Sequence, residues 1–326
     1  MQRTIHPEAG VGPVALTVSD LPRALAFYQR SLGFHVHAQA DGTAYLGGES
    51  TNQPGRDILV LTERRGARKA PGTSGLYHFA VVVPSRLELA RVLQRLVETR
   101  TPLQGFADHL GSEAIYLADP DGNGIEVYRD RPRQEWQYAP DGSLRMATDP
   151  LDMEGLWAEL DGQPDGWPGL HSQTRLGHMH LHVASIAEAE AFYHDILGFD
   201  LVLRYGPTAS FFSAGGYHHH VGVNTWAGVG APPAPAGAVG LRWFAVHLPD
   251  AAALQAVVEQ VDAAGVPVDE TGGGFLVHDP SGNAVLLATV SQPAGALTGP
   301  GPLRDANRAA GGDAALQPVY AEGGKG

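Results

Sequence analysis

Alternating apolar and polar positions recur four times along the chain, each time just before a segment with helical spacing. The alternating runs read VALTV, YHFAVVV, HMHLHVA and WFAVHL. Successive side chains of a strand point to opposite faces, so each run predicts a strand, and the segment after it predicts an amphipathic helix. Short apolar runs separated by glycine turns follow and predict further strands. The pattern therefore predicts four modules, each with a strand, a helix and three strands.

The modules repeat at a constant distance along the chain. LTVSDLPRALAFYQRSLGF starts at Leu16, and its match LHVASIAEAEAFYHDILGF starts at Leu181, an offset of 165 residues. The same offset relates HFAVVVP at His78 to WFAVHLP at Trp243, and DPDGNGIEV recurs as DPSGNAVLL. Internal repetition of this kind fixes the organisation of a fold. We expect an α+β fold of four βαβββ modules with curved mixed sheets.

The repeat divides the chain into segments with different expected roles. They are an N-terminal extension (1–10), modules at 11–64 and 75–131, a linker (132–175), modules at 176–226 and 239–291, and a tail (292–326). The linker holds one short helical patch around residues 151–160. The tail is rich in Gly, Ala and Pro, which predicts a disordered extension.

Composition narrows the possible partners. The net charge is −13 and the basic residues are scattered, so nucleic acid is not an expected partner. The chain has no cysteine, which leaves His, Asp and Glu as metal ligands. No export signal and no apolar run of about 20 residues is present, so we expect a cytoplasmic protein without a membrane segment. Exposed strand edges are compatible with a homodimer.

The phase of each strand places ligand-type side chains on one face. Met179 and Leu181 mark the helix side of their strand, so His178 points to the other side. By the same argument His78 and Glu126 point away from the helices of the second module. Two imidazoles and a carboxylate with open coordination positions suit ferrous iron and also manganese.

A single strand histidine is more often an interior ring than a ligand, but these three residues coincide at repeat-equivalent positions. The first and fourth modules carry Pro13, Trp243 and Leu286 at the corresponding positions. Ligand types therefore survive only in the second and third modules. If modules paired in chain order, the ligands would be divided between two half sites. We predict instead that the second module pairs with the third and the first with the fourth, or that another subunit completes the site.

The segment GGYHHHVGVN contains three consecutive histidines. Val221 and Val223 set the phase, which predicts that His218 and His220 share the side of His178 while His219 lies with the valines. An exposed polar strand remains an equal explanation for any one of these rings. We assign the other strand histidines, including His180 and His182, to structural or surface roles.

These motifs together resemble the vicinal oxygen chelate superfamily, which comprises glyoxalases, bleomycin resistance proteins and dioxygenases. Within it the chain is most similar to the two-domain catechol-2,3-dioxygenases, which are extradiol ring-cleaving enzymes. The resemblance rests on AFYxxxLGF, YLADPDGNGIEVY, GYHHHVGVNTW, DRPRQEW and LGHMHLHV, and it covers about Gly10 to Val290. It implies two glyoxalase-like domains, at residues 11–131 and 176–291.

The resemblance also implies roles for individual residues. The metal ligands would be His78, Glu126 and His178, holding Fe²⁺ or Mn²⁺. A histidine and a tyrosine near the DPDG turn would contact the bound catecholate and oxygen. The candidates for these two contacts are His109 and Tyr116. A further histidine would act as acid and base, and the candidate is His220, with His218 as the second choice.

The implied activity is that of a metal-dependent extradiol dioxygenase. It would cleave a catechol-type ring and incorporate both atoms of O2, as in aromatic hydrocarbon catabolism, so its partners would be a small aromatic diol and O2. Two alternatives stay open at this point. A metal-dependent isomerase or lyase of the glyoxalase type would need His220 as a fourth ligand, and a drug-resistance-type binding protein would need no metal.

Overall fold

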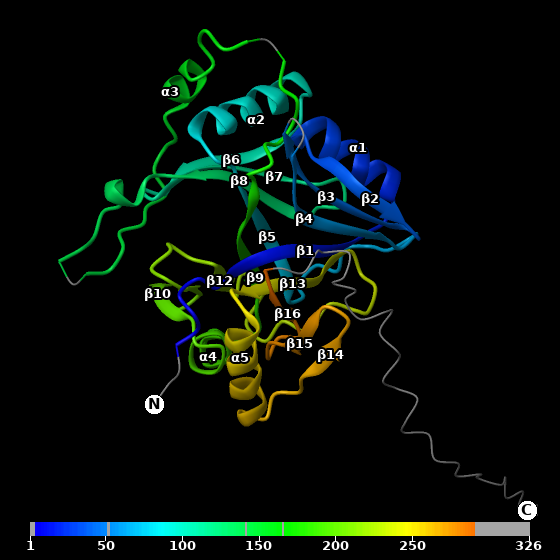
Figure 1. Ribbon diagram of the computed structural model, residues 1–326, viewed down its shortest axis with the longest axis vertical. Helices are drawn as coiled ribbons and strands as arrows, with labels where there is room; N and C mark the ends of the chain where they lie inside the picture. Colours follow the sequence, from blue (N-terminus) through cyan, green and yellow to red (C-terminus); the bar gives the residue numbers. More distant parts are fainter. Residues whose placement is uncertain (1–3, 51–52, 141, 165, 291–326) are drawn as a thin grey trace, which may run out of the picture.

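The computed structural model describes residues 4–50, 53–140, 142–164 and 166–290, and its elements follow the four predicted βαβββ modules (Figure 1). The tail at 292–326, which the composition predicts to be disordered, lies outside the described residues. Within the described ranges, no helix combines the length and the apolar character that crossing a membrane requires.

The first two modules have the same order of elements. The first consists of β1 (Gly10–Val18), α1 (Leu21–Leu32), β2 (His35–Ala40), β3 (Thr43–Ser50) and β4 (Gln53–Glu63). The second consists of β5 (Gly75–Val82), α2 (Arg86–Glu98), β6 (Leu103–Asp108), β7 (Ser112–Ala118) and β8 (Gly124–Asp130).

The linker and the last two modules complete the described chain. The linker holds a 3-10 turn, η1 (Arg133–Glu135), and the short helix α3 (Met153–Ala158), where the sequence predicts a helical patch. The third module consists of β9 (Arg175–His182), α4 (Ile186–Glu190), the π-helical turn η2 (Ala191–Ile196), β10 (Asp200–Tyr205), β11 (Ala209–Ser213) and β12 (Val221–Asn224). The fourth consists of β13 (Gly240–Leu248), α5 (Ala251–Ala263), β14 (Asp269–Thr271), β15 (Gly274–His278) and β16 (Ala284–Thr289).

The helix that follows the first strand begins in the same way in all four modules. Asp20, Ser85, Ser185 and Asp250 are N-cap residues with extended backbone, and each side chain accepts a hydrogen bond from the backbone N–H three residues later. This satisfies a backbone donor that has no partner inside the helix. A polar N-cap directly after an alternating apolar run therefore makes the chain turn from strand to helix at the same point of each module.

The strands form two eight-stranded sheets, and each sheet combines modules from both halves of the chain. One sheet has the order β14-β15-β16-β13-β1-β4-β3-β2, and the other has the order β10-β11-β12-β9-β5-β8-β7-β6. The first module thus joins the fourth through β1 and β13, and the second joins the third through β5 and β9. This confirms the predicted pairing of modules within one chain. Each sheet thus contains one module from the first half of the repeat and one from the second half.

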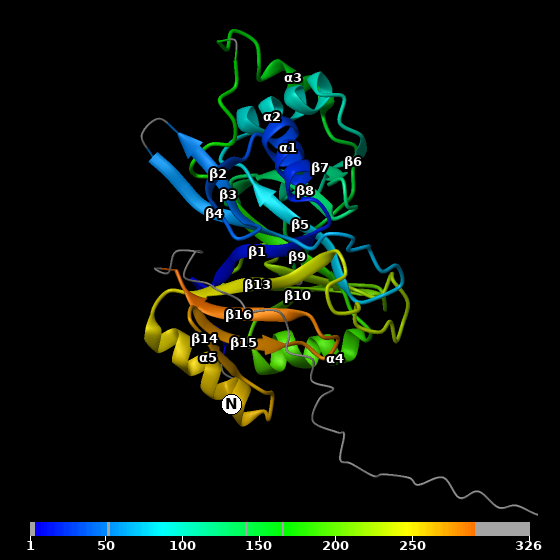
Figure 2. The ribbon, with the colours of Figure 1, turned by 90° about the vertical axis from the view of Figure 1, so that its right-hand side faces the viewer.

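The helix-facing sides of both sheets share one large apolar core. That core contains Leu16, Phe79, Leu181 and Phe244 from the first strands of the four modules, together with the buried faces of the helices. Helices α1 and α2 lie together at one end of the molecule, and α4 and α5 lie at the other end (Figures 1 and 2). The opposite, helix-free face of each sheet is therefore the surface on which a site can form.

Candidate metal centre

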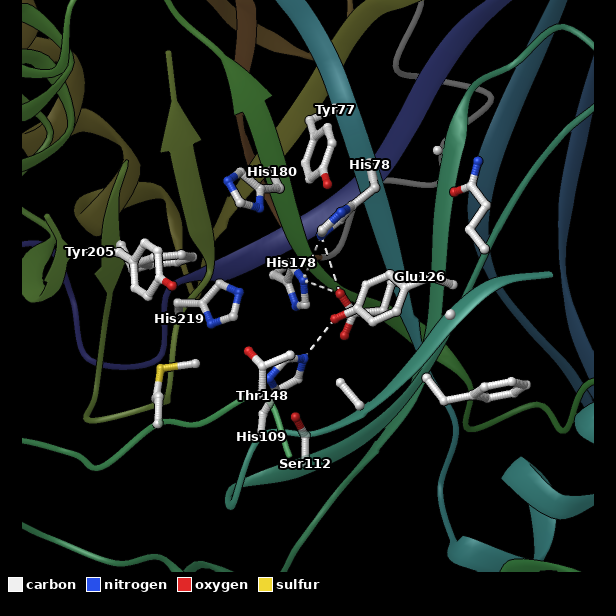
Figure 3. A pocket seen from close by; sticks show the side chains of 18 of the residues that line it. Tyr77, His78, His109, Ser112, Glu126, Thr148, His178, His180, Tyr205 and His219 are labelled. Carbon is white, nitrogen blue, oxygen red and sulfur yellow. Dashed lines mark hydrogen bonds and ion pairs between the residues drawn. The ribbon is translucent and has the colours of Figure 1, made fainter. Parts of the chain in front are cut away.

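Three ligand-type side chains predicted from the sequence meet on neighbouring strands of one sheet. His78 lies on β5, Glu126 on β8 and His178 on β9, and Ala80 of the central strand pairs with both Glu126 and His178. The Nε2 atoms of His78 and His178 are 3.3 Å apart, and Oε2 of Glu126 lies 3.2 Å from the first and 3.1 Å from the second. Figure 3 shows the three side chains converging. We call them the triad.

The spacing of the triad fits a metal ion. In an octahedral site with bonds of about 2.1 Å, ligand atoms at right angles lie about 3.0 Å apart, close to the 3.1, 3.2 and 3.3 Å observed here. In the described part of the chain, this is the only group of three His, Asp or Glu side chains whose ligand atoms all lie within 4.8 Å of one another. Two imidazoles and one carboxylate leave other coordination positions free for substrates.

The protonation of the triad also suits a metal. Burial lowers the pKa of His178 to about 4, although the neighbouring Glu126 opposes the shift. Burial would raise the pKa of Glu126, but His178 and His78 outweigh it and hold that pKa well below its usual value. At neutral pH the site therefore offers a carboxylate and, at His178, a neutral imidazole, which are the forms that bind metals.

The triad lies on the wall of a cavity of about 750 Å³. Strands β6, β7, β8, β5 and β9 contribute to its wall, and β10 and β11 reach it from the third module. The linker closes part of the cavity because Met146, Ala147 and Thr148 line it. Trp136, Leu144 and Tyr217 form a small apolar cluster that attaches this stretch of the linker to the third module. The connection between the two halves of the chain is thus part of the site.

His109 and Tyr116 lie in the same cavity and contact each other. Nε2 of His109 is 2.6 Å from the hydroxyl of Tyr116, and Nδ1 is 2.6 Å from the backbone carbonyl of Ala147. A carbonyl only accepts, so Nδ1–H donates to Ala147, and in the neutral ring Nε2 then accepts from the Tyr116 hydroxyl. Burial raises the pKa of Tyr116 well above its usual value, with Glu126 adding to the effect. The tyrosine therefore keeps its proton, and the linker orients the histidine.

A chain of hydrogen bonds connects Asp130 to the cavity through the histidine triplet. Nε2 of His218 lies 2.9 Å from Oδ1 of Asp130, and Nδ1 of His218 lies 2.9 Å from Nδ1 of His219. Burial would raise the pKa of Asp130, but the hydrogen bond from His218 outweighs it and the pKa is lowered. Burial lowers the pKa of His219 well below its usual value, so that ring is neutral. With a neutral His218 donating to the carboxylate from Nε2, Nδ1 of His218 accepts from Nδ1–H of His219. This leaves Nε2 of His219 without a proton. The ring of His219 lines the cavity, and its centroid is 4.1 Å from that of His178.

The expected orientation of the triplet is wrong for two of its three rings. His219 lines the cavity, whereas His220, the residue expected there, does not. His220 instead accepts a hydrogen bond from the backbone N–H of Ala214 at Nδ1, and burial lowers its pKa to about 3. The reason is that β12 begins only at Val221. Residues before that point lie in a loop, where the alternation set by Val221 and Val223 no longer applies.

Two further cavity residues were assigned elsewhere or overlooked by the sequence argument. His180 is buried and lines the cavity, although we assigned it a structural role. Tyr77 lines it as well, because β5 has one extra residue between Leu76 and His78 relative to β9, and such a bulge redirects a side chain. The repeat contains a signal for His180, since the other three modules carry alanine at the corresponding position. No sequence signal marks the bulge.

Comparison with known proteins agrees with this arrangement. The sequence model of the glyoxalase/bleomycin resistance protein/dioxygenase superfamily matches residues 10–127 and 175–287. A protein of Bacillus subtilis (strain 168) named catechol-2,3-dioxygenase is 44% identical over 290 residues, which cover 88% of this chain and 99% of that protein. The resemblance stated from the sequence motifs is confirmed at the level of the superfamily.

Solved structures share the fold at low sequence identity. A crystal structure of a putative dioxygenase from Bacillus subtilis subsp. subtilis str. 168 has a TM-score of 0.61 and 16% identity, covering 89% of this chain and 87% of that one. Glyoxalase I from Zea mays has a TM-score of 0.53 and 16% identity, covering 86% and 92%. These two likenesses concern the fold alone. Since the superfamily's sequence model matches both halves of the repeat and one relative aligns along nearly its whole length, the chain belongs to the glyoxalase/bleomycin resistance protein/dioxygenase superfamily.

Proposed function

We propose that the protein is a metal-dependent extradiol dioxygenase, which cleaves a catechol-type ring and incorporates both atoms of O2. The observation that carries the proposal is the meeting of the triad, the His109–Tyr116 pair and His219 around one cavity. The name of the Bacillus subtilis relative supports the same reaction. The substrates would be a small aromatic diol and O2.

The triad would hold Fe²⁺, with Mn²⁺ as the other metal that accepts these ligands. When bound, such a metal brings both hydroxyl groups of the catechol and O2 together and allows electrons to pass from the ring to oxygen. The protein's part is to fix three ligands on one side and leave the cavity side open. Glu126 supplies one negative charge to a set that otherwise consists of imidazoles.

His219 is the residue that we propose moves protons in this reaction. Its Nδ1 donates to His218, so Nε2 can accept a proton from a catechol hydroxyl and later return it. Asp130 and His218 act as positioning residues, because their hydrogen bonds fix which nitrogen of His219 carries the proton. This role replaces the one that the sequence motifs assign to His220.

His109 and Tyr116 lie beside the triad and would orient the substrate and oxygen. Tyr116 keeps its proton and donates to His109, so the pair can shift its hydrogen bond toward charge that develops on a substrate oxygen. The carbonyl of Ala147 keeps the ring of His109 in one orientation during this shift.

The glyoxalase-type alternative lacks a specific supporting observation. It requires a fourth protein ligand, and the group of ligand atoms within the described residues contains three. The candidate for the fourth ligand, His220, does not line the cavity. The dioxygenase therefore remains the one function that we propose.

The test is anaerobic reconstitution with ferrous iron, followed by oxygen-electrode and absorbance measurements with catechol. We expect one iron per chain, rapid oxygen uptake and a yellow ring-fission product. His178→Ala should lose both the bound iron and the oxygen uptake. His247→Ala, in the other sheet, is the matched control and should keep both. Iron binding without oxygen uptake across a panel of catechols would contradict the proposal.

A further inference from the structure

The cavity is much larger than a single catechol ring requires. Its volume of about 750 Å³ lies in the upper part of the range of about 300–1,000 Å³ that holds drug-sized ligands. A lone ring with two hydroxyl groups bound at the triad would leave most of this volume to solvent. The shape of the remaining space therefore bears on which catechol the site accepts.

An aromatic wall occupies the cavity on the side of β9 and β12. It consists of Tyr77, His180, Phe211 and Trp226. The ring of His180 is 5.0 Å from Tyr77, 5.5 Å from Phe211 and 5.4 Å from Trp226, and Tyr77 and Trp226 are 5.1 Å apart. Most of these contacts are edge to face. Such an array presents ring faces and edges to a planar apolar ligand.

The aromatic wall is continuous with the triad. The ring of His78 lies 5.0 Å from His180 and 5.1 Å from Tyr77. Trp226, at the outer end, is 49% exposed. A substrate ring held at the triad could thus carry a substituent that runs directly along the wall and covers the exposed indole.

The repeat shows that the central residue of this wall, His180, is particular to the third module. His180 stands where the other three modules carry Ala15, Ala80 and Ala245. The residue opposite His180 on β12 is Gly222, and a Cβ there would lie 3.2 Å from the His180 ring. Glu126 occupies the position of Gly222 in the second module, opposite Ala80. The third module thus carries glycine and a buried ring where the second module carries Glu126 and an alanine.

Charge restricts the substituent as well as shape does. Among the described residues that line the cavity there is no Lys or Arg, and Glu126 of the triad is the only acid. A carboxylate on the substituent would lose part of its hydration there without gaining a cationic partner, which is unfavourable. The buried Nε2 of His180 has no hydrogen-bond partner among the described residues and offers one polar contact to a neutral group.

We propose that the aromatic wall is a subsite for a neutral aryl substituent, so that the preferred substrate is a two-ring catechol without an acidic side chain. This inference rests on the proposed dioxygenase function and specifies its substrate class. Tyr77, His180, Phe211 and Trp226 determine the specificity, while the triad, His109, Tyr116 and His219 act on the diol ring.

The test compares substrates that differ only in the substituent. Values of kcat/KM are measured for catechol, 3-phenylcatechol and 4-phenylcatechol, and for the matched pair 4-methylcatechol and 3,4-dihydroxybenzoate. We expect the better phenylcatechol to exceed catechol by about tenfold or more, mainly through a lower KM, as stacking with several rings would produce. The carboxylate should fall at least about tenfold below the methyl compound.

Variants of the wall connect this preference to its residues. The ratio of kcat/KM for phenylcatechol to that for catechol should fall about 3- to 10-fold in Trp226→Ala and in His180→Ala. Alanine is the residue that the other three modules carry at the position of His180. Trp157→Ala removes a partly exposed indole on α3 outside the cavity and should leave the ratio unchanged. Anaerobic calorimetry with the iron-loaded protein should show the same order in the Kd values.

The possible results distinguish a failure of the aryl subsite from a failure of the dioxygenase function. The subsite would be overturned if all neutral catechols were turned over with equal kcat/KM and neither variant changed the ratio of kcat/KM for phenylcatechol to that for catechol. The proposed dioxygenase function would be unaffected by that result. No ring fission of any catechol would defeat the dioxygenase. Calorimetry would then decide alone, because tighter binding of phenylcatechol that is lost in Trp226→Ala supports the subsite, and equal binding overturns it.

Discussion

The two sheets have the same strand arrangement and opposite contents on their helix-free faces. In the β5–β9 sheet, Ala80 pairs with Glu126, and the face opens into the cavity. In the β1–β13 sheet, Ala15 and Ala245 pair with Val60 and Leu286 at the equivalent positions. There, an apolar cluster that includes Trp243 fills the face.

The difference shows that the helix-free face of a sheet can either carry a metal site with a cavity or be filled by apolar side chains, but not both. Trp243 stands at the position of His178 and is 2% exposed. A bulky ring that removes a ligand also occupies the space that a substrate would need. We infer that one sheet of each chain carries the chemistry and that the other stabilises the fold.

The largest effect expected on the open sheet comes from His219→Gln. This variant removes the proposed proton carrier, and kcat should fall about 10²- to 10⁴-fold, the usual range for a general acid–base residue. Steady-state oxygen uptake with iron content as the control measures it. His220→Gln is the comparison, since its ring lies outside the cavity. A larger loss in His220→Gln than in His219→Gln would refute our assignment.

On the filled sheet the corresponding change affects stability. Trp243→Ala should lower the free energy of unfolding by about 3–5 kcal/mol, because it removes a buried indole and leaves a cavity. Urea denaturation measures this, and iron stoichiometry should stay unchanged. A loss below about 1 kcal/mol would mean that the apolar cluster of this sheet is not a tightly packed part of the core.

The smallest expected effect is a dependence of stability on pH. The pKa of His220 is lowered from 6.5 to about 3 by burial. The unfolded chain therefore binds more protons than the folded chain between these values, and the free energy of unfolding falls as the pH drops below about 6.5. For His220 this loss is about 2 kcal/mol between pH 7 and pH 5.

Urea denaturation of the metal-free protein at pH 7 and pH 5 tests this. His220→Gln should show a decrease between the two pH values that is smaller than that of the wild type by about this amount. His247, in the other sheet, has its pKa lowered to about 4, also by burial. His247→Gln should therefore behave similarly, so acid sensitivity does not distinguish the sheets. An unchanged decrease in both variants would show that these rings are not buried in neutral form.

The sequence alone was enough to predict the modules, the triad and the pairing of modules. The repeat compares four versions of one strand, and two of them keep a histidine where the others carry Pro13 and Trp243. Hydrophobic phase then places His78, Glu126 and His178 on one face, because regular strands alternate. Strand order follows from the need to bring those ligands together.

Where the backbone departs from regular strand geometry, side chains no longer alternate, and the sequence pattern does not predict which face a residue points to. His219 and His220 exchange their expected places because a loop precedes β12. Tyr77 reaches the cavity through a bulge. The linker contributes Met146, Ala147 and Thr148 through tertiary packing, which local periodicity does not encode. These irregular segments supply a minority of the residues that line the cavity, and regular strands supply the rest.

The pairing of the first module with the fourth also has a consequence for synthesis on the ribosome. Gly10 of β1 pairs with His247 of β13, so one edge of β1 has no native partner until almost the whole described chain has been translated. At about 5–20 residues per second this wait lasts roughly 10–50 s. The nascent protein therefore passes through a long period with an open strand edge, during which chaperones or another nascent copy can bind it.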